Sequence, residues 1–494
     1  MTEHPISRQL IVGMLLVLLM PLLLRAGLDE GIPASAWPAA WLAPPRTAGE
    51  LGVRSFRESP LLREQVKAGT LPPLEDRLPD DPVVVEPFDR IGVHGGTARV
   101  FEPGFSRLNT SESPVTMGPQ VSRIIPNWAS GWEFRDGART FVLRLRAGLR
   151  WSDGTPLTAA DFVWRHEHEL MNPELTPVVP PRQVGMRVEA PDPLTVIFRF
   201  REPYAFILEE LAHRGQTFLL PGHFLRRYHP DFRDRDELVR EARAAGYISW
   251  MAYFTTAKGD SFRDPIGTPT IRAYRIVRRS PTLQVWARNP YYHKVDPAGN
   301  QLPYIDFYEV QPAENEEVVS AKVSTGQMDF AGSTLQTQDI PLFKIGEKAY
   351  GFRTLIWNRL HGVDVVIQPN LTIENPRLRK LFRDRRFRIA LSLAINRDEI
   401  NEIVYFGQGS PRQTTVIPSS RYYDPSFASA YVAYDPQRAR ALLDEIGLHD
   451  TDGDGIRSFP DGTSVVITLE VASAPVVPPF PMVRVPSLIN VAPL

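Results

Sequence analysis

FVLRLRAGLRWSDGTPLTAADFVW, residues 141–164, contains three local patterns that follow one another along the chain. Every second residue from Phe141 to Leu145 is a large apolar one, which predicts a half-buried strand. Small polar residues at 152–154 then favour a tight turn. Thr158 stands three residues before Asp161, and this spacing is typical of a capped helix start. The stretch therefore predicts a strand, a turn and a capped helix.

Further motifs extend this pattern along the chain. The run Arg288–Tyr292 has the sequence RNPYY, and the apolar segment Arg385–Ile395 is followed by Asn-Arg-Asp. Together with 141–164 they resemble the extracellular solute-binding proteins of family 5, the oligopeptide-, dipeptide- and nickel-type binding components of ABC importers. The resemblance covers roughly residues 90–471. Ala273 replaces a Gly-Pro pair that is usual in the family.

The resemblance implies an α/β fold of the periplasmic-binding-protein-like type II class, with two lobes, a hinge and an extra subdomain. The family pattern stops near residue 471, so we expect an incomplete second lobe and a C-terminally truncated chain. The expected organisation is a signal peptide or N-terminal anchor at 1–36, a Pro/Ala-rich extension at 37–82, lobe I with the inserted subdomain at 83–350, a partial lobe II at 351–474 and an aberrant Pro-rich tail at 475–494. We expect residues 37–82 to be a linker or a loosely packed segment.

Composition excludes several classes of function. The 494 residues carry 56 Lys and Arg against 57 Asp and Glu, so no global field favours nucleic acid or an anionic membrane. There are no cysteines, which excludes disulfides, thiolate metal sites and a cysteine nucleophile. No phosphate-binding loop is present, so the ATPase of any transporter would be another chain. Paired carboxylates are merely adjacent in sequence, and we expect no enzyme activity.

The N-terminus predicts the compartment. Arg8 precedes Leu10–Leu24, an uncharged run of 15 residues. This run is short for a membrane span, which needs roughly 20 apolar residues, but is typical of a secretory signal. Ala34-Ser35-Ala36 offers a small-x-small cleavage site. A cleaved signal, an uncleaved anchor and a buried core helix all stay open. Either of the first two predicts a periplasmic or extracellular protein that meets the membrane only through this segment or a permease.

The candidate ligand residues come from the resemblance. Peptide-binding members use an aspartate in the loop before a Tyr-Asp-Pro helix to pair with the α-ammonium group of the ligand. The comparable loop here is Ile417–Asp424, which implies Asp424 as the anchor and Tyr422 and Tyr423 as aromatic walls. Because Asp before Pro commonly starts a turn, a purely capping role for Asp424 is the open alternative. The resemblance implies four further candidates: Trp357, Asn358, Ser111 and Glu112.

One acidic loop has the spacing of a calcium site. Asp450, Asp452, Asp454 and Asp461 stand at positions 1, 3, 5 and 12 of a D-x-D-x-D-G pattern. Carboxylates at alternate positions of such a loop can converge on one hard cation. Position 12 is Asp instead of Glu, so a turn without metal is the alternative. No other cofactor is expected.

Two other charged runs are interpreted as surface. His166-Glu167-His168-Glu169 places its histidines two residues apart, which points them to different sides of a helix and argues against a shared metal. The basic run 377–388 contains few aromatic residues, and we expect a solvated helix face instead of a nucleic-acid site.

The function that the resemblance implies is binding of a peptide or another small solute and its delivery to an ABC permease. Ligand contacts from both lobes would favour a closed state, because only differential affinity shifts such an equilibrium. The permease and ATPase subunits would be separate chains. The alternative is a secreted binder outside transport, sensory or chaperone-like, or a defective remnant.

Overall fold

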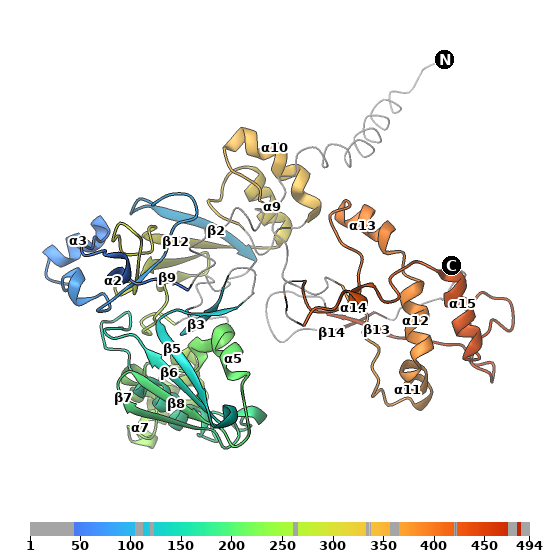
Figure 1. The fold of residues 1–494 in the computed structure, drawn as a ribbon, viewed down its shortest axis with the longest axis horizontal. Coiled ribbons are helices and arrows are strands. Elements are labelled where there is room, and N and C mark those ends of the chain that lie inside the picture. Colours follow the sequence, from blue (N-terminus) through green and yellow to red (C-terminus); the bar gives the residue numbers. More distant parts are fainter. Residues whose placement is uncertain are drawn as a thin grey trace, which may run out of the picture. The chain divides into compact units, whose positions relative to one another are not determined.

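The structure is a computed structural model that describes residues 44–103, 112–118, 123–259, 265–331, 335, 337–355, 365–418, 420, 422–472 and 482–485. The chain divides into two compact units, which we call the N-terminal unit (Pro33–Leu335) and the C-terminal unit (Gln336–Leu494) (Figure 1). This division lies earlier than the boundary expected after residue 350. The expected signal segment, 1–36, and the tail from 486 onward lie outside the described residues.

Residues 44–82 fold onto the N-terminal unit, so the prediction of a loosely packed segment is wrong for them. They form α2 (Ala48–Leu51), α3 (Pro60–Lys67) and η3 (Leu74–Asp76), and lead into β1 (Val83–Val84). Strand β1 pairs in parallel with β11 (Lys294–Val295), and Leu74 packs with Val295 in one apolar cluster. The buried Arg77 adds an ion pair with Glu58. These contacts join segments distant in sequence, which a local pattern cannot reveal.

The first sheet of the N-terminal unit has the strand order β2-β12-β10-β9. Its strands are β2 (Thr97–Pro103), β9 (Tyr274–Ser280), β10 (Leu283–Arg288) and β12 (Phe307–Ala313). The two pairs β12–β10 and β10–β9 are antiparallel, whereas β2 is parallel to β12. Helix α9 (Glu316–Ser324) follows β12 and contacts β2. Strand β2 therefore joins a sheet whose other strands come much later in the chain.

The segment between β2 and β9 forms a subdomain around a second, antiparallel sheet of order β5-β6-β8-β7 (Figure 1). Its strands are β5 (Ala129–Arg135), β6 (Thr140–Leu145), β7 (Arg187–Asp192) and β8 (Thr195–Arg199), and the hairpin β3 (Val115–Met117) and β4 (Ile124–Pro126) precedes them. The strand predicted over 141–145 is confirmed as β6, and its Phe141 and Leu143 are fully buried. Leu143 pairs with Val196 of β8.

The predicted helix after the turn is confirmed as α4 (Ala160–Arg165). Asp161 accepts a bond from the Thr158 backbone N–H at 2.9 Å. Only this half of the expected capping box is found, because the residue that precedes the helix is Ala159, which has no capping side chain. The carboxylate of Asp161 also accepts the indole N–H of Trp151 at 3.2 Å. These two bonds therefore connect Trp151 and Thr158, on either side of the turn, to helix α4.

A layer of helices continues the subdomain. Its members are the π-helical turn η6 (His166–Leu170), α5 (Ile207–Arg214), α6 (Gly222–Leu225), α7 (Arg235–Ala244) and α8 (Trp250–Lys258), with short 3-10 turns at η5 (Asp136–Ala138), η7 (Pro181–Gln183), η8 (Gly215–Thr217) and η9 (Arg226–Tyr228). An aromatic cluster of Trp164, Trp250 and Phe254 lies between α4, η9 and α8. Its apolar residues bury the inner faces of these helices.

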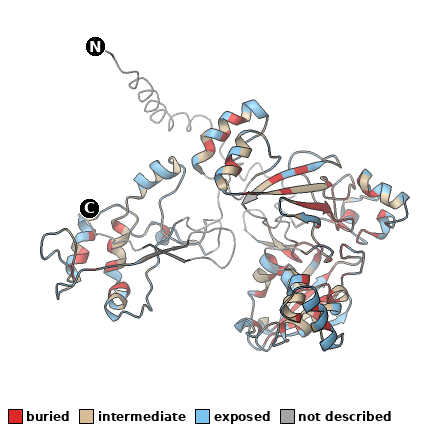
Figure 2. Cartoon of the chain, turned by 180° about the vertical axis from the view of Figure 1, so that it is seen from behind, coloured by how far each residue is buried: buried red, intermediate tan, exposed pale blue. Residues whose placement is uncertain are grey.

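The C-terminal unit is mainly helical over its described residues. Its elements are η10 (Thr337–Asp339), α10 (Ile340–Tyr350), α11 (Pro376–Arg383), α12 (Arg385–Leu393), α13 (Arg397–Tyr405), α14 (Pro425–Ser429), α15 (Pro436–Glu445) and the antiparallel strands β13 (Leu469–Ala472) and β14 (Met482–Val485). The apolar segment Arg385–Ile395 forms α12, and the Tyr-Asp-Pro motif at 434–436 leads into α15. The two helices pack on each other through Phe387 and Leu442. Helix α13 has no buried residue (Figure 2).

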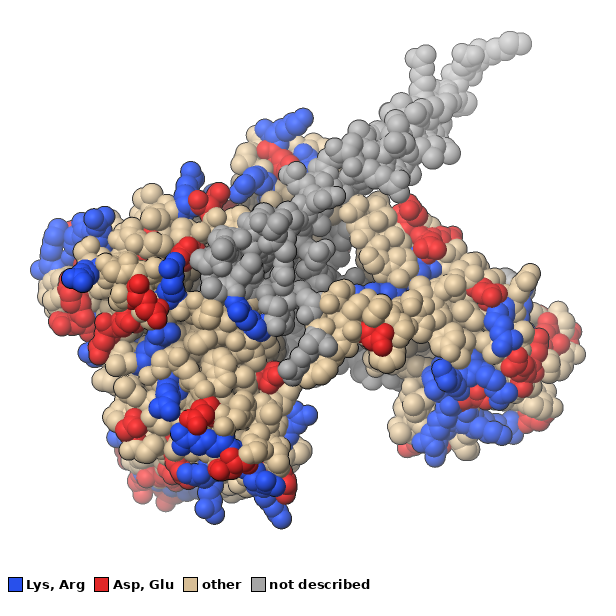
Figure 3. Space-filling view, in the orientation of Figure 1, with Lys and Arg blue, Asp and Glu red and all other residues tan. Residues whose placement is uncertain are grey.

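Arginines of the basic run lie over α11 and α12, where Lys and Arg gather on the surface (Figure 3). Several of them bond to nearby backbone: Arg379 donates to the carbonyl of Ile373 at 2.7 Å, and Arg383 to that of Leu371 at 2.8 Å. These hydrogen bonds hold the loop before α11 against that helix. Within the described parts of the chain, no helix is both long enough and apolar enough to span a bilayer.

Candidate functional site

Asp424 is the N-cap of α14, and Pro425 is the first residue of that helix. Its Oδ1 accepts the backbone N–H of Ser426 at 2.8 Å. The bonds to Ser426 hold the pKa of this carboxyl below its ordinary value, so the exposed group is ionised at neutral pH. The capping role that the sequence left open is therefore present. The ligand role of Asp424 stays a prediction.

The two tyrosines before Asp424 differ in exposure. Tyr422 is 69% exposed, whereas Tyr423 is half-buried. An exposed aromatic ring next to an ionised carboxylate has the chemistry to hold an ammonium group on one side and an apolar group on the other. Both residues belong to the C-terminal unit. The candidates Trp357, Asn358 and Ser111 lie outside the described residues.

Glu112 lies in the N-terminal unit, just before β3, and its carboxylate is buried in a polar network. Lys294 of β11 donates to Oε1 and Oε2 at 3.0 and 3.1 Å. Asn127 donates to Oε2 at 2.9 Å, and the Tyr292 hydroxyl donates to Oε1. Burial alone would raise the pKa of Glu112, but Lys294 and these hydrogen bonds outweigh it and lower that pKa. The contacts of Glu112 within the protein are therefore those of a structural residue, and its contact with a ligand stays a prediction.

His293 lies beside this network without joining it by a hydrogen bond. Its Nε2 is 3.7 Å from Oε2 of Glu112, and among the described residues neither ring nitrogen has a hydrogen-bond partner. Burial lowers the pKa of His293 to about 3, despite the nearby carboxylate. The ring is therefore neutral at physiological pH, and Lys294 is the cation that balances Glu112.

The acidic loop brings three of its four predicted ligands together. One carboxylate oxygen from each of Asp450, Asp452 and Asp454 lies within 4.8 Å of the others, and all three residues are exposed. Asp450 also accepts the backbone N–H groups of Gly453 and Gly455 at 2.8 and 3.0 Å. Asp461 is not part of this group.

Asp461 instead forms an ion pair with Arg377 at 2.6 Å and accepts the backbone N–H of Thr463 at 3.1 Å. The loop thus has the contacts of an Asx-rich turn, which was the alternative to calcium binding. Calcium binding by the remaining three carboxylates stays a prediction.

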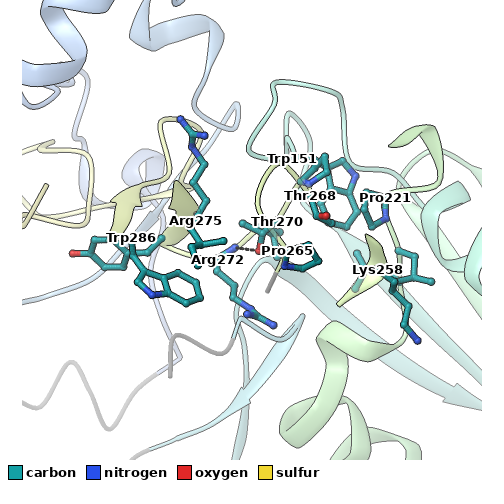
Figure 4. Close-up of a pocket in the computed structure, with 15 residues that line it drawn as sticks. Trp151, Pro221, Lys258, Pro265, Thr268, Thr270, Arg272, Arg275 and Trp286 are labelled. Atoms are coloured by element: carbon teal, nitrogen blue, oxygen red, sulfur yellow. Dashed lines mark hydrogen bonds between the residues drawn. The ribbon is translucent and has the colours of Figure 1, made fainter. Parts of the chain in front are cut away.

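A small pocket lies inside the N-terminal unit, where the subdomain joins the first sheet (Figure 4). Its volume is about 100 Å³, enough for a few water molecules or one small chemical group. Trp151 and Pro221 line one side of it and Trp286 and Arg275 the other. The indole N–H of Trp286 is buried and has no partner among the described residues.

The wall of this pocket connects the turn at 152–154 to the segment that precedes β9. The backbone N–H of Ser152, in the turn of the opening stretch, donates to the carbonyl of Thr270 at 2.9 Å. Thr270 N–H donates back to Oγ of Ser152 at 3.0 Å. His223 Nε2 lies 2.8 Å from Oδ2 of Asp153 in the same turn. The polar residues of the turn therefore hold the subdomain together, a role that spacing alone did not show.

Comparison with protein families gives a match over most of the chain. The family described as "Bacterial extracellular solute-binding proteins, family 5 Middle" matches residues 123–479. The chain belongs to the family 5 solute-binding proteins. Members of family 5 are periplasmic solute-binding proteins of ABC transporters and not enzymes.

Two curated family 5 relatives differ in the solute that their names give. The periplasmic alpha-galactoside-binding protein of Rhizobium meliloti is 25% identical over 452 residues, covering 83% of this chain and 62% of its own length. A putative ABC transporter peptide-binding protein of Brucella ovis is 26% identical over 366 residues, covering 73% of this chain and 60% of its own. The chain thus spans about three fifths of the length of these curated relatives.

The matching solved structures are likewise named for both peptide and sugar ligands. The oligopeptide-binding protein OppA matches with a TM-score of 0.67 and 32% identity, over 87% of this chain and 68% of that chain. The periplasmic binding protein MelB from Agrobacterium fabrum, in complex with stachyose, matches with a TM-score of 0.61 and 25% identity, over 83% and 65%. These matches confirm the expected periplasmic-binding-protein-like α/β fold.

Proposed function

We propose that this chain binds a small solute, with peptide as the first candidate, and delivers it to an ABC import permease. The observation that carries the proposal is the family match over residues 123–479. The permease and the ATPase are separate chains, and the protein works in the periplasm or at the cell surface. Export through the segment Leu10–Leu24 fits this location.

Asp424 supports peptide as the solute. Its carboxylate is ionised and exposed, and the Tyr422 ring beside it is exposed as well. A free peptide carries an α-ammonium group that pairs with such a carboxylate, whereas a neutral sugar offers only hydroxyl groups. A ligand that displaces water from this carboxylate without offering a positive charge leaves the carboxylate unpaired, which is costly. This position would therefore select for ligands with an ammonium group.

An α-galactoside is the second candidate. It is favoured by one observation, namely that a curated relative and a solved neighbour are named for, or contain, such a sugar. Exposed tyrosine rings suit sugar faces as well as peptide side chains. The two candidates therefore differ most clearly in whether binding depends on a positive charge of the ligand.

The test compares three ligand sets on the purified chain by calorimetry and thermal shift. The sets are short peptides with a free N-terminus, the same peptides N-acetylated, and stachyose as an α-galactoside. Binding of the free peptides, with about 10-fold or more weaker binding after acetylation, supports peptide as the solute. Binding of stachyose alone supports the second candidate, and binding of none of them contradicts both.

Transport itself needs a separate measurement, because a secreted binder outside transport would also bind solute. The gene is deleted in its host, and uptake of the labelled solute is measured with and without the restored gene. Loss and recovery of uptake support delivery to a permease. Unchanged uptake together with clear binding in vitro would favour the sensory or chaperone-like alternative.

A further inference from the structure

Helix α11 and the first turn of α12 carry a dense group of cations, which we call the basic patch. Its seven members are Arg377, Arg379, Lys380, Arg383, Arg385, Arg386 and Arg388. Asp384 is the only acidic residue in the run 377–388. Lys and Arg gather at this place on the face of the C-terminal unit that Figure 3 shows. The local charge is therefore strongly positive, although the whole chain has a net charge of -1.

Helix α11 is amphipathic, and its apolar side is already in use. Leu381 and Phe382 are buried in the apolar core of the C-terminal unit, and Leu378 packs against that core. The cations of the helix lie on its other side, where Lys380 and Arg383 are exposed. Because the apolar residues face inward, a partner on the outer side of α11 would be held by charge and hydrogen bonds.

Most of the positive charge in the basic patch is not balanced by nearby acids. Arg377 pairs with Asp461 at 2.6 Å, and Arg386 pairs with Asp384 at 2.7 Å. The other five of the seven cations have no ion-pair partner among the described residues. Five positive charges are therefore available to an anion from outside.

Backbone carbonyls hold several of these cations in place without neutralising them. Arg379 and Arg383 bond to the loop before α11, and Arg388 donates to the carbonyl of Phe382 at 2.7 Å. A carbonyl oxygen accepts a hydrogen bond but carries no net charge, and a guanidinium has five N–H donors, so donors and charge are left over. The Lys380 ammonium has no partner among the described residues. The basic patch is thus fixed in position and keeps its charge.

We propose that the basic patch binds an anionic lipid surface through the phosphate groups of phospholipids. Clusters of about four to eight Lys and Arg are attracted to such surfaces. Six of the seven cations are arginines, whose planar guanidinium groups match phosphate oxygens in pairs. Tyr431 lies at the edge of the patch, where its exposed hydroxyl accepts from Arg385 at 3.1 Å, and tyrosine is frequent at the level of lipid headgroups.

A lipid surface fits the basic patch better than an acidic protein does. Protein interfaces concentrate their affinity in buried aromatic and apolar anchors and have few charges at their centre, whereas this patch has charge at its centre. A protein that delivers solute to a permease works next to a membrane. The inference rests on the proposed function for this location alone, because lipid binding by the patch does not require a bound solute.

The experiment sediments the full chain with two kinds of vesicle. One kind is pure phosphatidylcholine, and the other contains phosphatidylcholine and phosphatidylglycerol in equal amounts. The ratio of the two partition coefficients isolates the effect of lipid charge, because the apolar run Leu10–Leu24 enters both kinds alike. We expect a preference for phosphatidylglycerol that disappears between about 0.01 M and about 1 M salt, as the Debye length falls from about 30 Å to about 3 Å.

Two patch variants and two matched controls decide the assignment. Lys380→Gln removes one exposed cation, and the double variant adds Arg383→Gln. The preference for phosphatidylglycerol should fall about 5-fold in the first and about 25-fold in the second, since each cation near the surface contributes about 5-fold. The controls are Lys348→Gln in α10 and Arg240→Gln in α7, which each remove one exposed cation outside the patch. Both should leave the preference unchanged.

Three results would overturn the proposal. They are equal partition of the native chain into both kinds of vesicle, an unchanged preference in the double variant, and an equal loss of preference in the controls. Binding to poly-L-glutamate without binding to vesicles would assign the patch to an acidic protein segment and also overturn it.

Two further measurements keep these results unambiguous. The melting temperature of each variant separates loss of charge from loss of the fold. If the double variant proves unfolded because Arg383 no longer holds its loop, Lys380→Gln decides alone. Calorimetry with the solutes named above is run on the same samples. Vesicle binding without solute binding contradicts the proposed function alone, and the reverse result contradicts the lipid-binding patch alone.

Discussion

Lys294 and Glu112 form a buried ion pair, with the ammonium nitrogen 3.0 Å from Oε1 of the carboxylate. Their side chains are 15% and 7% exposed. Glu112 precedes β3, whereas Lys294 lies in β11, so the pair joins the start of the subdomain to the part of the unit that also holds β1. The backbone carbonyl of Glu112 accepts the indole N–H of Trp128 at 3.3 Å, which anchors the residue further.

Glu112→Gln is expected to destabilise the protein strongly. The amide keeps the size of the side chain but leaves the Lys294 ammonium buried without its counter-charge. Breaking a buried pair from one side costs about 3–5 kcal/mol. Urea unfolding at pH 7 measures this loss. Glu133→Gln is the matched control, because Glu133 pairs with Arg135 at the surface. An equally small change in both variants would contradict the assigned role of Glu112.

His293 is expected to make the protein sensitive to acid. Its folded-state pKa is about 3, whereas an unfolded histidine titrates near 6.5. Below pH of about 6.5 the unfolded chain gains a proton that the folded chain does not, so stability is full above that pH and falls as the pH decreases. The loss is about 1.4 kcal/mol per pH unit. Between pH 6.5 and 5 it reaches about 2 kcal/mol.

His293→Phe removes the titrating group and keeps a flat ring in the same buried position. We expect the difference in unfolding free energy between the variant and the native chain to grow in favour of the variant from pH 7 to pH 5. Urea unfolding at several pH values measures it. Parallel pH profiles for the two proteins would show that His293 has its ordinary pKa in the folded state.

Asp161 is expected to have the opposite effect to His293, so that it stabilises the protein more at low pH than at neutral pH. Burial raises its pKa to about 6, above the value of about 3.9 in an unfolded chain. The contribution of the protonated group to stability is therefore complete below pH of about 3.9 and is lost as the pH rises through about 6. The total loss is roughly 3 kcal/mol, from two pKa units at about 1.4 kcal/mol each.

Asp161→Asn stays neutral and keeps one oxygen for the Thr158 N–H and the Trp151 indole, which both bond to Oδ2. The unfolding free energy of the variant minus that of the native chain should increase by roughly 3 kcal/mol between pH 4 and pH 7. Chemical unfolding across this range tests it. A constant difference would mean that Asp161 has an ordinary pKa in the folded protein.

The sequence predicted those features that depend on neighbours along the chain. The strand at 141–145, the helix α4 and the cap at Asp424 each follow from periodicity or from the local chemistry of one turn. The buried pair of Arg77 and Glu58 does not, because it depends on how residues 44–82 fold back. A proline-rich composition therefore suggested a linker where the chain forms short, capped helices.

The candidate site shows the same limit. Glu112 was assigned from family resemblance, but its bonds to Lys294 and Tyr292 come from a segment of the chain that no local pattern connects to it. The spacing of His166 and His168 gave no partner for the side chain of His168, whereas its Nδ1 lies 2.7 Å from Oδ2 of Asp231, 63 residues later in the chain. Residues that meet only through tertiary structure leave no spacing in the sequence.

Asp424→Asn separates the ligand role of this residue from its capping role. Asparagine is as good an N-cap as aspartate, so α14 keeps its first bond to the Ser426 N–H and the melting temperature should stay unchanged. The negative charge is lost. If Asp424 holds the α-ammonium group of a peptide, affinity for free peptides should fall by roughly 10- to 100-fold, since charged hydrogen bonds contribute about 1.5–3 kcal/mol.

The N-acetylated peptides provide the internal control for that prediction, because they have no ammonium group and should bind both proteins equally. Asp435→Asn provides a second control: Asp435 caps α15 with a bond to the Arg438 N–H at 2.9 Å, and it lies in the same unit. Calorimetry with both peptide forms measures all three proteins. Equal affinity of the native chain and Asp424→Asn for free peptides would leave Asp424 with capping alone, and would move the search for the anchor to another residue.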